Sequence, residues 1–378
     1  MRKLLIIILL IILNSCGGWI KIKKIPTDSR DNLMYGNTPQ RDFYIPIEIS
    51  DSLEFSWEAD TKGSHAHTAV TTVSRFLFIG DLAGRLICYN RITGKKVGEL
   101  KNDGDISIAP AIGKYRLVYV VNEFKEKYST VVFYDYIVGK IRHEIELPGK
   151  FVNELIIENE FVYLLSEEGK LYKYNMKGEQ EWMYDAKCLT ISIPAVYKEQ
   201  ILFNNAKGEI IAVEKNFGKE LYRKKITKSF ESGISVSDEK AFLGDTEGFL
   251  FCFDCEKRDI EWKFDTGSKI RSLAVFDNTN IFVGNLNGDF FSVSKTDGKL
   301  NWKTETGGLL NTPALVFKNL VVVPDQDQKV YFINKEDGVI TNSIEFGKRV
   351  KLAPVYSDNT LFFGADRGII YAYKIIMN

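Results

Sequence analysis

The chain has 378 residues, of which 50 are basic and 50 are acidic, so its formal net charge is zero at neutral pH. Proteins that bind nucleic acids usually carry an excess of basic residues, and this balance therefore gives no indication of a nucleic-acid partner. Loss of Arg2 and Lys3 with an N-terminal leader would leave 48 basic and 50 acidic residues, which does not change that conclusion.

The first 15 residues have the parts of a secretory signal peptide. Arg2 and Lys3 form a basic start, an apolar run of ten residues follows from Leu4 to Leu13, and small residues lead to Cys16. The run is much shorter than the ~20 residues that a helix needs to cross a bilayer. We therefore expect residues 1–15 to be a cleaved signal peptide and not a permanent membrane anchor.

Cys16 stands directly after this signal. The stretch from Leu13 to Cys16 resembles the lipobox of bacterial lipoproteins, whose cysteine is acylated and becomes the N-terminus after cleavage. The resemblance implies that Cys16 carries the lipid, and several acyl chains together hold a protein stably at a membrane. An ordinary signal peptide followed by an incidental cysteine is the alternative.

The residue after the lipidated cysteine bears on where such a protein resides. In Gram-negative lipoproteins an aspartate at that position tends to retain the protein in the inner membrane, whereas this chain has Gly17. The resemblance therefore implies secretion across the inner membrane and a lipid anchor in the outer membrane, facing the periplasm.

Residues 16–52 lack the repeated pattern of the rest of the chain. They contain Lys21, Lys23 and Lys24 near the start and several polar turn formers further on. We expect this segment to be a tether between the lipid and a folded domain. Its early lysines are also suited to contact with anionic lipid headgroups, although a solvated linker is the simpler interpretation.

From residue 53 to residue 378 the sequence repeats itself with a period near 40. Glycines recur at this spacing, and Gln328 takes one of the glycine positions. The markers are Gly84, Gly169, Gly208, Gly248, Gly288 and Gly368. The gap between the first two markers holds one further, degenerate unit with about five extra residues, which gives eight repeats.

Aromatic residues form a second ladder in phase with the glycines; all but Trp57, which precedes the first marker glycine by 27 residues, follow a glycine by 13 or 14 residues. Because each lies on the last strand of its unit, we expect these side chains to pack between neighbouring units rather than to bind a sugar or a quinone. The members are Trp57, Trp182, Tyr222, Trp262 and Trp302, and Asn342 occupies the next position.

Short alternating runs separated by Asn-Gly and Asp-Gly turns lie between the markers, as in residues 280–302. Each repeat is therefore predicted to be an antiparallel meander of about four strands. Because a unit of this size cannot bury both its faces alone, radial repetition is the expected solution. The predicted fold is all-β, an eight-bladed β-propeller of four-stranded antiparallel blades.

The last unit is short of one strand. Ten residues follow Gly368, while residues 54–59 match the fourth strand of the unit at residues 259–264. We therefore expect the N-terminal strand to complete the C-terminal blade and close the ring. Loss of either end would leave an unpaired sheet edge.

The repeats resemble those of quinoprotein-type propellers, most clearly in residues 284–291 and 297–302. Residues 34–41 also resemble the segment that leads into the first blade in that superfamily, so the likeness extends from Met34 to the end of the chain. A single eight-bladed ring behind a lipid anchor resembles the BamB type of outer-membrane protein assembly factor. This resemblance implies a non-catalytic scaffold that binds protein partners, among them a barrel-inserting outer-membrane protein, through loops on one propeller face.

A dehydrogenase that uses pyrroloquinoline quinone (PQQ) is the main alternative. Such an enzyme needs a divalent cation with oxygen ligands, a carboxylate base and, in the alcohol dehydrogenases, a disulfide between adjacent cysteines. This sequence has no adjacent cysteine pair, and its regular units leave little loop material for a site. Sugar-oxidising quinoproteins bind the cofactor differently and escape the cysteine argument. We expect no PQQ and no catalytic residues; a propeller that binds envelope glycans or proteins in another role is a third interpretation.

Histidines and cysteines give weak signals for metal or redox chemistry. His65 and His67 point to one face of a predicted extended segment, but no cysteine or further histidine lies near them in sequence, so we expect no metal site. Cys252 and Cys255 have the spacing of a redox pair, but on a strand they would face opposite sides. The interior cysteines are expected to be buried thiols: Cys88, Cys188 and Cys252.

The second unit carries its extra residues between two strands, from Asn122 to Ser129. This segment is charged and contains two aromatic residues, Phe124 and Tyr128. Exposed aromatic residues flanked by charge are favourable contact material at protein interfaces. The hypothesis is that Phe124 and Tyr128 contribute to partner docking, and a tolerated insertion in a surface hairpin is the alternative.

Overall fold

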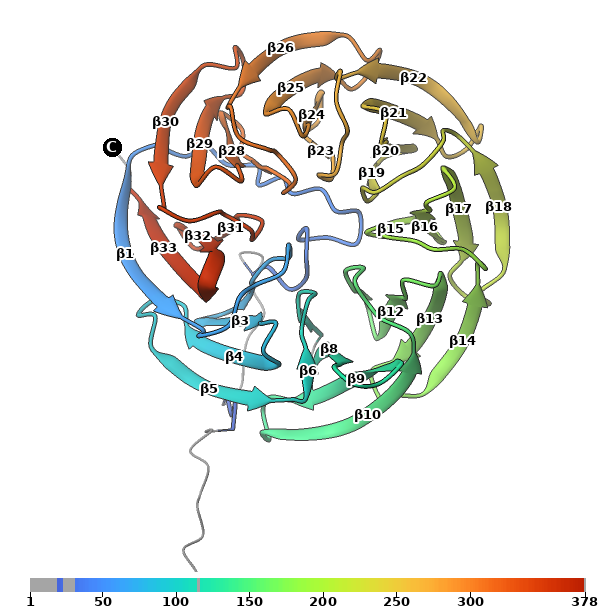
Figure 1. Ribbon diagram of the computed structural model, residues 1–378, viewed down its shortest axis with the longest axis vertical. Helices are drawn as coiled ribbons and strands as arrows, with labels where there is room; N and C mark the ends of the chain where they lie inside the picture. The colour runs from blue at the N-terminus through green and yellow to red at the C-terminus, as the bar shows by residue number, and fades with distance from the viewer. Residues whose placement is uncertain (1–18, 23–30, 114–115, 377–378) are drawn as a thin grey trace, which may run out of the picture.

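The computed structural model describes residues 19–22, 31–113 and 116–376. These residues form a ring of eight β-sheets around a central axis (Figure 1). In these three stretches the sole helical element is the 3-10 turn η1 (Asp366–Gly368), and nothing helical there has the length and hydrophobicity to cross a bilayer. The predicted eight-bladed propeller is therefore confirmed.

In each blade the strands are antiparallel and follow one another from the axis to the rim. Blade 1 contains β2 (Thr71–Val73), β3 (Phe76–Gly80), β4 (Arg85–Asn90) and β5 (Lys96–Lys101). Blade 2 contains β6 (Gly104–Asp105), β7 (Ala111–Ile112), β8 (Leu117–Glu123), β9 (Tyr128–Asp135) and β10 (Lys140–Pro148). Blade 3 contains β11 (Ile156–Glu158), β12 (Phe161–Leu165), β13 (Lys170–Asn175) and β14 (Gln180–Asp185). Blade 2 departs from the four-stranded pattern, because β6 and β7 share the inner position and both pair with β8.

Blades 4 to 6 are regular. Blade 4 contains β15 (Ala195–Tyr197), β16 (Gln200–Asn204), β17 (Glu209–Glu214) and β18 (Glu220–Lys225). Blade 5 contains β19 (Ser235–Ser237), β20 (Lys240–Gly244), β21 (Phe249–Asp254) and β22 (Asp259–Asp265). Blade 6 contains β23 (Val275–Phe276), β24 (Asn280–Gly284), β25 (Asp289–Ser294) and β26 (Leu300–Glu305). Blade 7 contains β27 (Leu315–Val316), β28 (Leu320–Pro324), β29 (Lys329–Asn334) and β30 (Ile340–Glu345).

The ring closes in blade 8 between the two ends of the chain. This blade contains β31 (Val355–Ser357), β32 (Thr360–Ala365) and β33 (Ile369–Ile375), and its outer strand is β1 (Leu53–Asp60). β1 pairs antiparallel with β33, with Trp57 opposite Ala372. The N-terminal strand thus completes the C-terminal blade, as predicted.

The glycine ladder marks the turn between the second and third strands of a blade. At Gly288 the backbone angle φ is +85°, a conformation that side chains with a Cβ rarely adopt, and an added Cβ would lie 2.8 Å from the carbonyl oxygen of Gly308. The side chain of Asn285 caps the turn by accepting hydrogen bonds from two following N–H groups, at 2.9 and 3.0 Å. Gln328 adopts the same left-handed conformation in blade 7.

The aromatic ladder lies at the contacts between blades. Trp302, on the outer strand of blade 6, covers Gly338 in the turn between the third and fourth strands of blade 7. Its indole Nε1 donates a hydrogen bond to the carbonyl oxygen of Lys335 at 2.9 Å. The same two contacts with the next blade are made by Trp57, Trp182 and Trp262. Each of these indoles therefore fills the space above a glycine and satisfies one backbone carbonyl.

Residues 31–52 differ from the expected tether, because they pack against the ring. Tyr35, Arg41 and Phe43 are buried, and backbone hydrogen bonds join this segment to the inner strands of blades 4, 5 and 7. Figure 1 shows the segment, in blue, crossing the ring axis. Its apolar and aromatic residues, which a solvated linker does not need, provide the driving force for this packing. The predicted signal peptide and Cys16 lie outside the described residues.

Candidate functional site

One face of the ring carries the connections between successive blades. Each connection is hydrogen-bonded to the turn between the second and third strands of the blade that it enters, as in Ala206 N–H to Leu189 O (3.1 Å) and Gln326 N–H to Leu309 O (3.0 Å). We term this surface the crossover face, and the opposite surface, with the other hairpin turns, the turn face. The connections are residues 61–70, 102–110, 149–155, 186–194, 226–234, 266–274, 306–314 and 346–354.

A funnel of about 300 Å³ lies at the axis, lined by the connections, and Tyr35 from the N-terminal segment forms part of its wall. Glu231 at the funnel is paired with Lys269 (2.7 Å) and Arg271 (2.6 Å), and these cations lower the pKa of its carboxyl. The amide of Asn153 is already used by the backbone, because its Nδ2 donates to two carbonyl groups within 3.2 Å and its Oδ1 accepts a backbone N–H at 2.7 Å. Glu231 and Asn153 are thus both engaged by other groups of the ring.

Arg41 and Glu154 form a buried charged centre beside the funnel. The Arg41 guanidinium donates to four backbone carbonyl groups, those of Tyr35, Glu154, Leu155 and Pro194. The Glu154 carboxylate accepts hydrogen bonds from the Thr68 hydroxyl (2.6 Å) and the Ala109 N–H (2.8 Å). This centre ties the N-terminal segment to the connections that enter blades 1 to 4.

Burial dominates the titration of both charged groups. It raises the pKa of Glu154 to about 7, although the two hydrogen bonds and the charge of Arg41 oppose the rise. Burial likewise lowers the pKa of Arg41 to about 10, against the charge of Glu154. No sequence signal indicated this centre beyond the position of Arg41 at the end of residues 34–41.

The two histidines of the predicted extended segment have different surroundings. His65 is buried, with Nδ1 3.4 Å from the carbonyl oxygen of Gly80, and burial lowers its pKa to about 4. His67 lines the funnel, where partial burial, followed by the charge of Lys351, lowers its pKa. In the part of the chain that the structure describes, no three His, Cys, Asp or Glu side chains are grouped so as to hold a metal ion.

The funnel does not offer the ligands that PQQ and its cation require. Glu231 is the one carboxylate among the described lining residues, and it is neutralised by its two cations. The lining, as far as it is described, contains neither a tryptophan to stack on a quinone nor a cysteine. The residues present therefore do not fit PQQ held through a divalent cation.

The cysteines at positions 88, 188, 252 and 255 are free and buried. Burial raises the pKa of Cys255 to about 12 and also raises the pKa of Cys88 and Cys252. Cys255 lies in the turn after β21 and not on the strand as expected, yet it is not joined to Cys252. Thiols with raised pKa are poor nucleophiles, so these residues suit the core.

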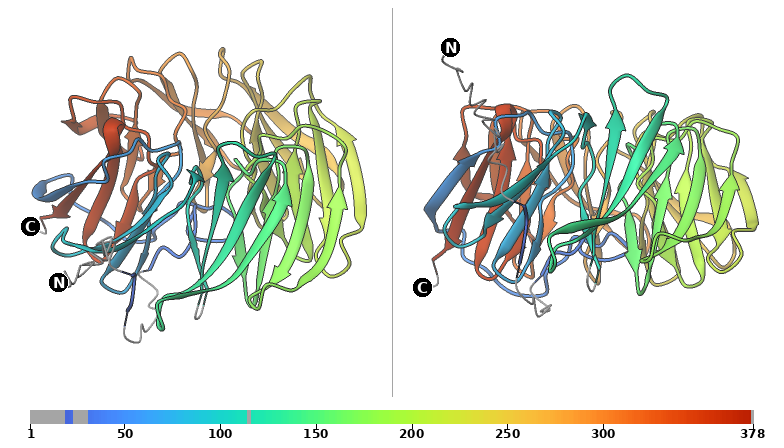
Figure 2. Two further views of the ribbon diagram at one scale, coloured as in Figure 1. Left: turned by 60° about the horizontal axis from the view of Figure 1, so that its bottom comes forward. Right: turned by 90° about the horizontal axis from the view of Figure 1, so that it is seen from below.

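Phe124 and Tyr128 lie on the β8–β9 hairpin, which projects from the crossover face (Figure 2). β8 and β9 have seven and eight residues, against five and six in β16 and β17, so the extra residues lengthen the strands rather than form a loop. Phe124 is 56% exposed at the tip, whereas Tyr128 is half-buried and pairs with Pro148 on β10. Phe124 is therefore the more accessible of the two.

The crossover face also exposes apolar side chains that the repeat pattern did not single out. Leu189 and Ile191, on the connection into blade 4, are 60% and 52% exposed. Thr190 between them is buried, and its hydroxyl donates to the carbonyl oxygen of Asn204, so its two neighbours point outward. The alternation Leu-Thr-Ile inside a connection was the available sequence signal. The exposed large apolar residues on this face are Leu82, Phe124, Val152, Leu189, Ile191 and Leu309.

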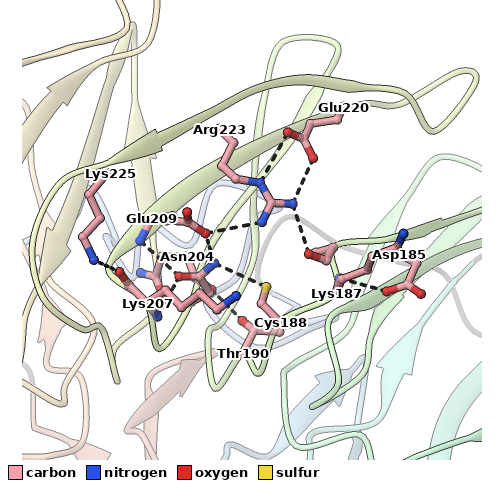
Figure 3. Close-up of polar contacts among 12 residues, drawn as sticks. Asp185, Lys187, Cys188, Thr190, Asn204, Lys207, Glu209, Glu220, Arg223 and Lys225 are labelled. Atoms are coloured by element: carbon pink, nitrogen blue, oxygen red, sulfur yellow. Dashed lines mark hydrogen bonds and ion pairs between the residues drawn. The ribbon is translucent and has the colours of Figure 1, made fainter.

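Polar contacts hold the connection into blade 4 in place (Figure 3). Arg223 donates to the carbonyl oxygen of Ala186 at 3.1 Å and is itself paired with Glu209 and Glu220. The amide of Asn205 donates to Sγ of Cys188 at 3.3 Å. Together with the Thr190 hydrogen bond, these contacts anchor the segment at three positions. Leu189 and Ile191 are therefore presented by an ordered segment.

A family model and several solved structures are similar to this chain. The model of the outer membrane protein assembly factor BamB matches residues 116–241 and 246–376. No curated protein matches the sequence. Among solved structures, BamB from Moraxella catarrhalis aligns with a TM-score of 0.72 at 14% identity, over 86% of this chain and 100% of that chain.

Two further solved structures have the same ring. A computationally designed protein aligns with a TM-score of 0.71 at 13% identity, over 88% of this chain and 99% of that chain. The quinohemoprotein alcohol dehydrogenase ADHIIG from Pseudomonas putida aligns with a TM-score of 0.75 at 10% identity, over 92% of this chain and 80% of that chain. At such identities the structural likeness shows the fold alone.

Proposed function

The chain belongs to the family of the outer membrane protein assembly factor BamB, and from this premise we propose that it is a non-catalytic scaffold in outer-membrane protein assembly. The observation that carries the proposal is the crossover face, where an ordered ring presents exposed apolar side chains on its connections. Exposed apolar groups rimmed by polar residues are typical of protein interaction sites.

The partner surface is centred on Leu189 and Ile191 and extends to Val152 and Phe124. Leu189 and Ile191 are anchored by the buried Thr190, so little conformational entropy is lost when they are covered. Phe124 adds an aromatic contact at the tip of the projecting hairpin, and Tyr128 lies next to the tip at the start of β9. The partner is a protein of an envelope complex, namely a barrel-inserting outer-membrane protein.

A lipid on Cys16 would hold this scaffold in the outer membrane, facing the periplasm. The support for this location is the sequence, which has a basic start, a short apolar run and Cys16 followed by Gly17. Membership of the BamB family agrees with such a location.

A PQQ-dependent dehydrogenase is the less supported alternative. The ring of the alcohol dehydrogenase is similar, but Glu231 is already paired with two cations and the amide of Asn153 is already used by the backbone. The proposal therefore includes neither a cofactor nor a reaction.

The test is purification of the tagged, lipidated protein in mild detergent, followed by mass spectrometry of the co-purified proteins. Leu189→Asp with Ile191→Asp is expected to lower recovery of the barrel protein about tenfold or more, as for loss of a hot spot. Phe124→Ala with Tyr128→Ala is expected to give a smaller loss. Phe217→Asp, on the turn face and 73% exposed in the wild type, is the matched control and should not change recovery.

Each outcome bears on a separate part of the proposal. Full recovery of the barrel protein with the Leu189 and Ile191 variant would show that these two residues are not part of the partner contact. Recovery at the wild-type yield with the double alanine variant would show the same for Phe124 and Tyr128. Failure of the wild-type protein to bring down any envelope protein would reject the scaffold role and direct work to quinone and glycan binding.

A further inference from the structure

The contact between blades 1 and 2 lacks the tryptophan that blades 3, 5, 6 and 8 place against the next blade. The equivalent position on β5 is occupied by Gly98. Gly98 lies opposite Cys88 on the third strand of blade 1, and Trp262 lies opposite Cys252 on the third strand of blade 5. A glycine cannot fill the space above Gly139, the blade 2 counterpart of the glycines that receive an indole elsewhere.

The described N-terminal residues 19–22 occupy that space instead. Ile20 and Ile22 are buried in one apolar cluster with residues of blades 1 and 2. The atoms that lie nearest to an added Cβ at Gly139 belong to Lys21 (3.2 Å) and to the carbonyl of Ile20 (3.5 Å). The hydroxyl of Tyr134 also donates to the Ile20 carbonyl at 2.8 Å.

The segment also replaces the hydrogen bond of the missing indole. In blade 7 the carbonyl that accepts the Trp302 indole belongs to Lys335, three residues before the covered glycine. The corresponding carbonyl in blade 2 belongs to Tyr136, and it accepts the backbone N–H of Ile22 at 2.7 Å. Residues 19–22 therefore supply both the packing and the hydrogen bond that an indole supplies in other blades, which fixes them to the ring.

This attachment creates a mixed apolar and basic surface at the rim. Trp19 is 63% exposed, and it lies in grooves shared with the exposed Val138 and Ile141 of blade 2. Among the described residues that line these grooves, Glu99 has the one carboxylate, and it is already paired with Lys96 and Lys101. We define the rim patch as Trp19, Lys21, Lys101, Val138, Lys140 and Ile141.

Part of the rim patch lies close in sequence to Cys16, and this indicates that the patch contacts a membrane. Trp19 is three residues after Cys16, a span of at most about 10 Å in an extended chain. Because residues 19–22 are held by blades 1 and 2, a lipid on Cys16 must lie close to the rim patch. Tryptophan is favoured at the membrane–water interface, and lysines there attract anionic headgroups.

We propose that the rim patch is a membrane-contact surface, in which Trp19, Val138 and Ile141 enter the interfacial region of the bilayer and the lysines face anionic headgroups. This proposal rests on the lipidation of Cys16 in the proposed function. It implies that the ring is held by its edge at blades 1 and 2, which leaves the crossover face open to a protein partner.

The test compares two labelled sites on lipidated protein in vesicles of phosphatidylethanolamine and phosphatidylglycerol. Val138→Cys and Phe217→Cys each precede the glycine of an equivalent turn, Gly139 and Gly218, so they are matched in local structure. The thiols at positions 88, 188, 252 and 255 are buried, so a fluorophore reacts with the introduced cysteine. Lipids that carry a spin label near the headgroup are expected to quench the probe at Val138→Cys about threefold or more strongly than at Phe217→Cys.

Controls separate the rim patch from the anchor. Trp19→Ala with Lys140→Glu should reduce quenching at position 138 while the protein still floats with the vesicles. Equal quenching at both sites in protein that floats with the vesicles would overturn the membrane-contact proposal and leave the scaffold role intact. Failure of the wild-type protein to float would instead show that Cys16 carries no lipid and so remove the premise of the proposal. A concentration-dependent dimer that Trp19→Ala abolishes would assign the patch to a second copy of the chain and overturn the proposal.

Discussion

Replacement of Arg41 by methionine tests the buried charged centre. Methionine retains much of the length of the side chain but removes all the hydrogen bonds that the guanidinium donates to four backbone carbonyl groups. It also leaves the Glu154 carboxyl in a buried site without the nearby positive charge. The N-terminal segment would then lose its attachment at the ring axis.

The expected cost follows from these contacts. Removing one partner of a buried charged pair typically lowers the free energy of unfolding by about 3–5 kcal/mol, because the remaining charge is uncompensated. The double variant with Glu154→Gln removes that charge, so part of the loss should be recovered, with a coupling free energy of about 1 kcal/mol or more. The coupling would not appear if the two side chains acted independently.

Urea unfolding followed by circular dichroism measures these free energies. Arg75→Met is the control, since Arg75 is exposed, and its effect should stay within about 0.5 kcal/mol. A loss below about 1 kcal/mol for Arg41→Met would refute the reasoning, because a fully buried guanidinium with four acceptors would then contribute no more than a surface residue.

Two further perturbations test the ring closure and the buried carboxylate. Deleting residues 53–59 removes most of β1 and exposes the edge of β33, so we expect aggregation and a melting temperature lower by about 5 °C or more; an unchanged melting temperature would count against this closure. Burial raises the pKa of Glu154 from 4.5 to about 7 in the folded state, so between these pH values the folded protein binds more protons than the unfolded chain. The contribution of Glu154 to the free energy of unfolding therefore falls as the pH rises through that interval. Glu154→Gln should therefore gain stability relative to the wild type between about pH 5 and about pH 8 in thermal unfolding, and a pH-independent difference would contradict the raised pKa.

The fold was predictable because its determinants are local and repeated. A glycine that must adopt a positive φ recurs in each regular turn, and Trp262 and Trp302 each need a glycine on the next blade. The missing strand of the last unit was visible as an unmatched copy in residues 54–59. Because these requirements recur from blade to blade, they produce a period in the sequence that is detectable without knowledge of long-range contacts.

The N-terminal contacts were not predictable, because each occurs once. Arg41 is an ordinary charged residue until the chain crosses the axis and brings it to Glu154, more than a hundred residues away. Ile20 and Ile22 replace an indole only because Gly98 vacates that position. His143 is a similar case, since it occupies the aromatic position of blade 2 and covers Gly178.

The surface that we propose for a partner includes one residue singled out from the sequence and two that were not. The length anomaly of the second unit led to Phe124, but it did not show that the strands themselves are longer. Leu189 and Ile191 were missed because their one sequence signal, the alternation with Thr190 inside a connection, does not show which of the alternating side chains is exposed. Their exposure depends on the anchoring of Thr190 and Ala186 by residues of blade 4.

Site-specific crosslinking in cells tests the central claim most directly. A photoreactive amino acid placed at Leu189 should crosslink to a barrel-inserting outer-membrane protein identified by mass spectrometry, whereas the same group at Phe217, on the turn face, should not. Crosslinks to that protein at Phe217 but not at Leu189 would contradict the assignment of the crossover face, and absence of any envelope protein at both positions would contradict the scaffold role.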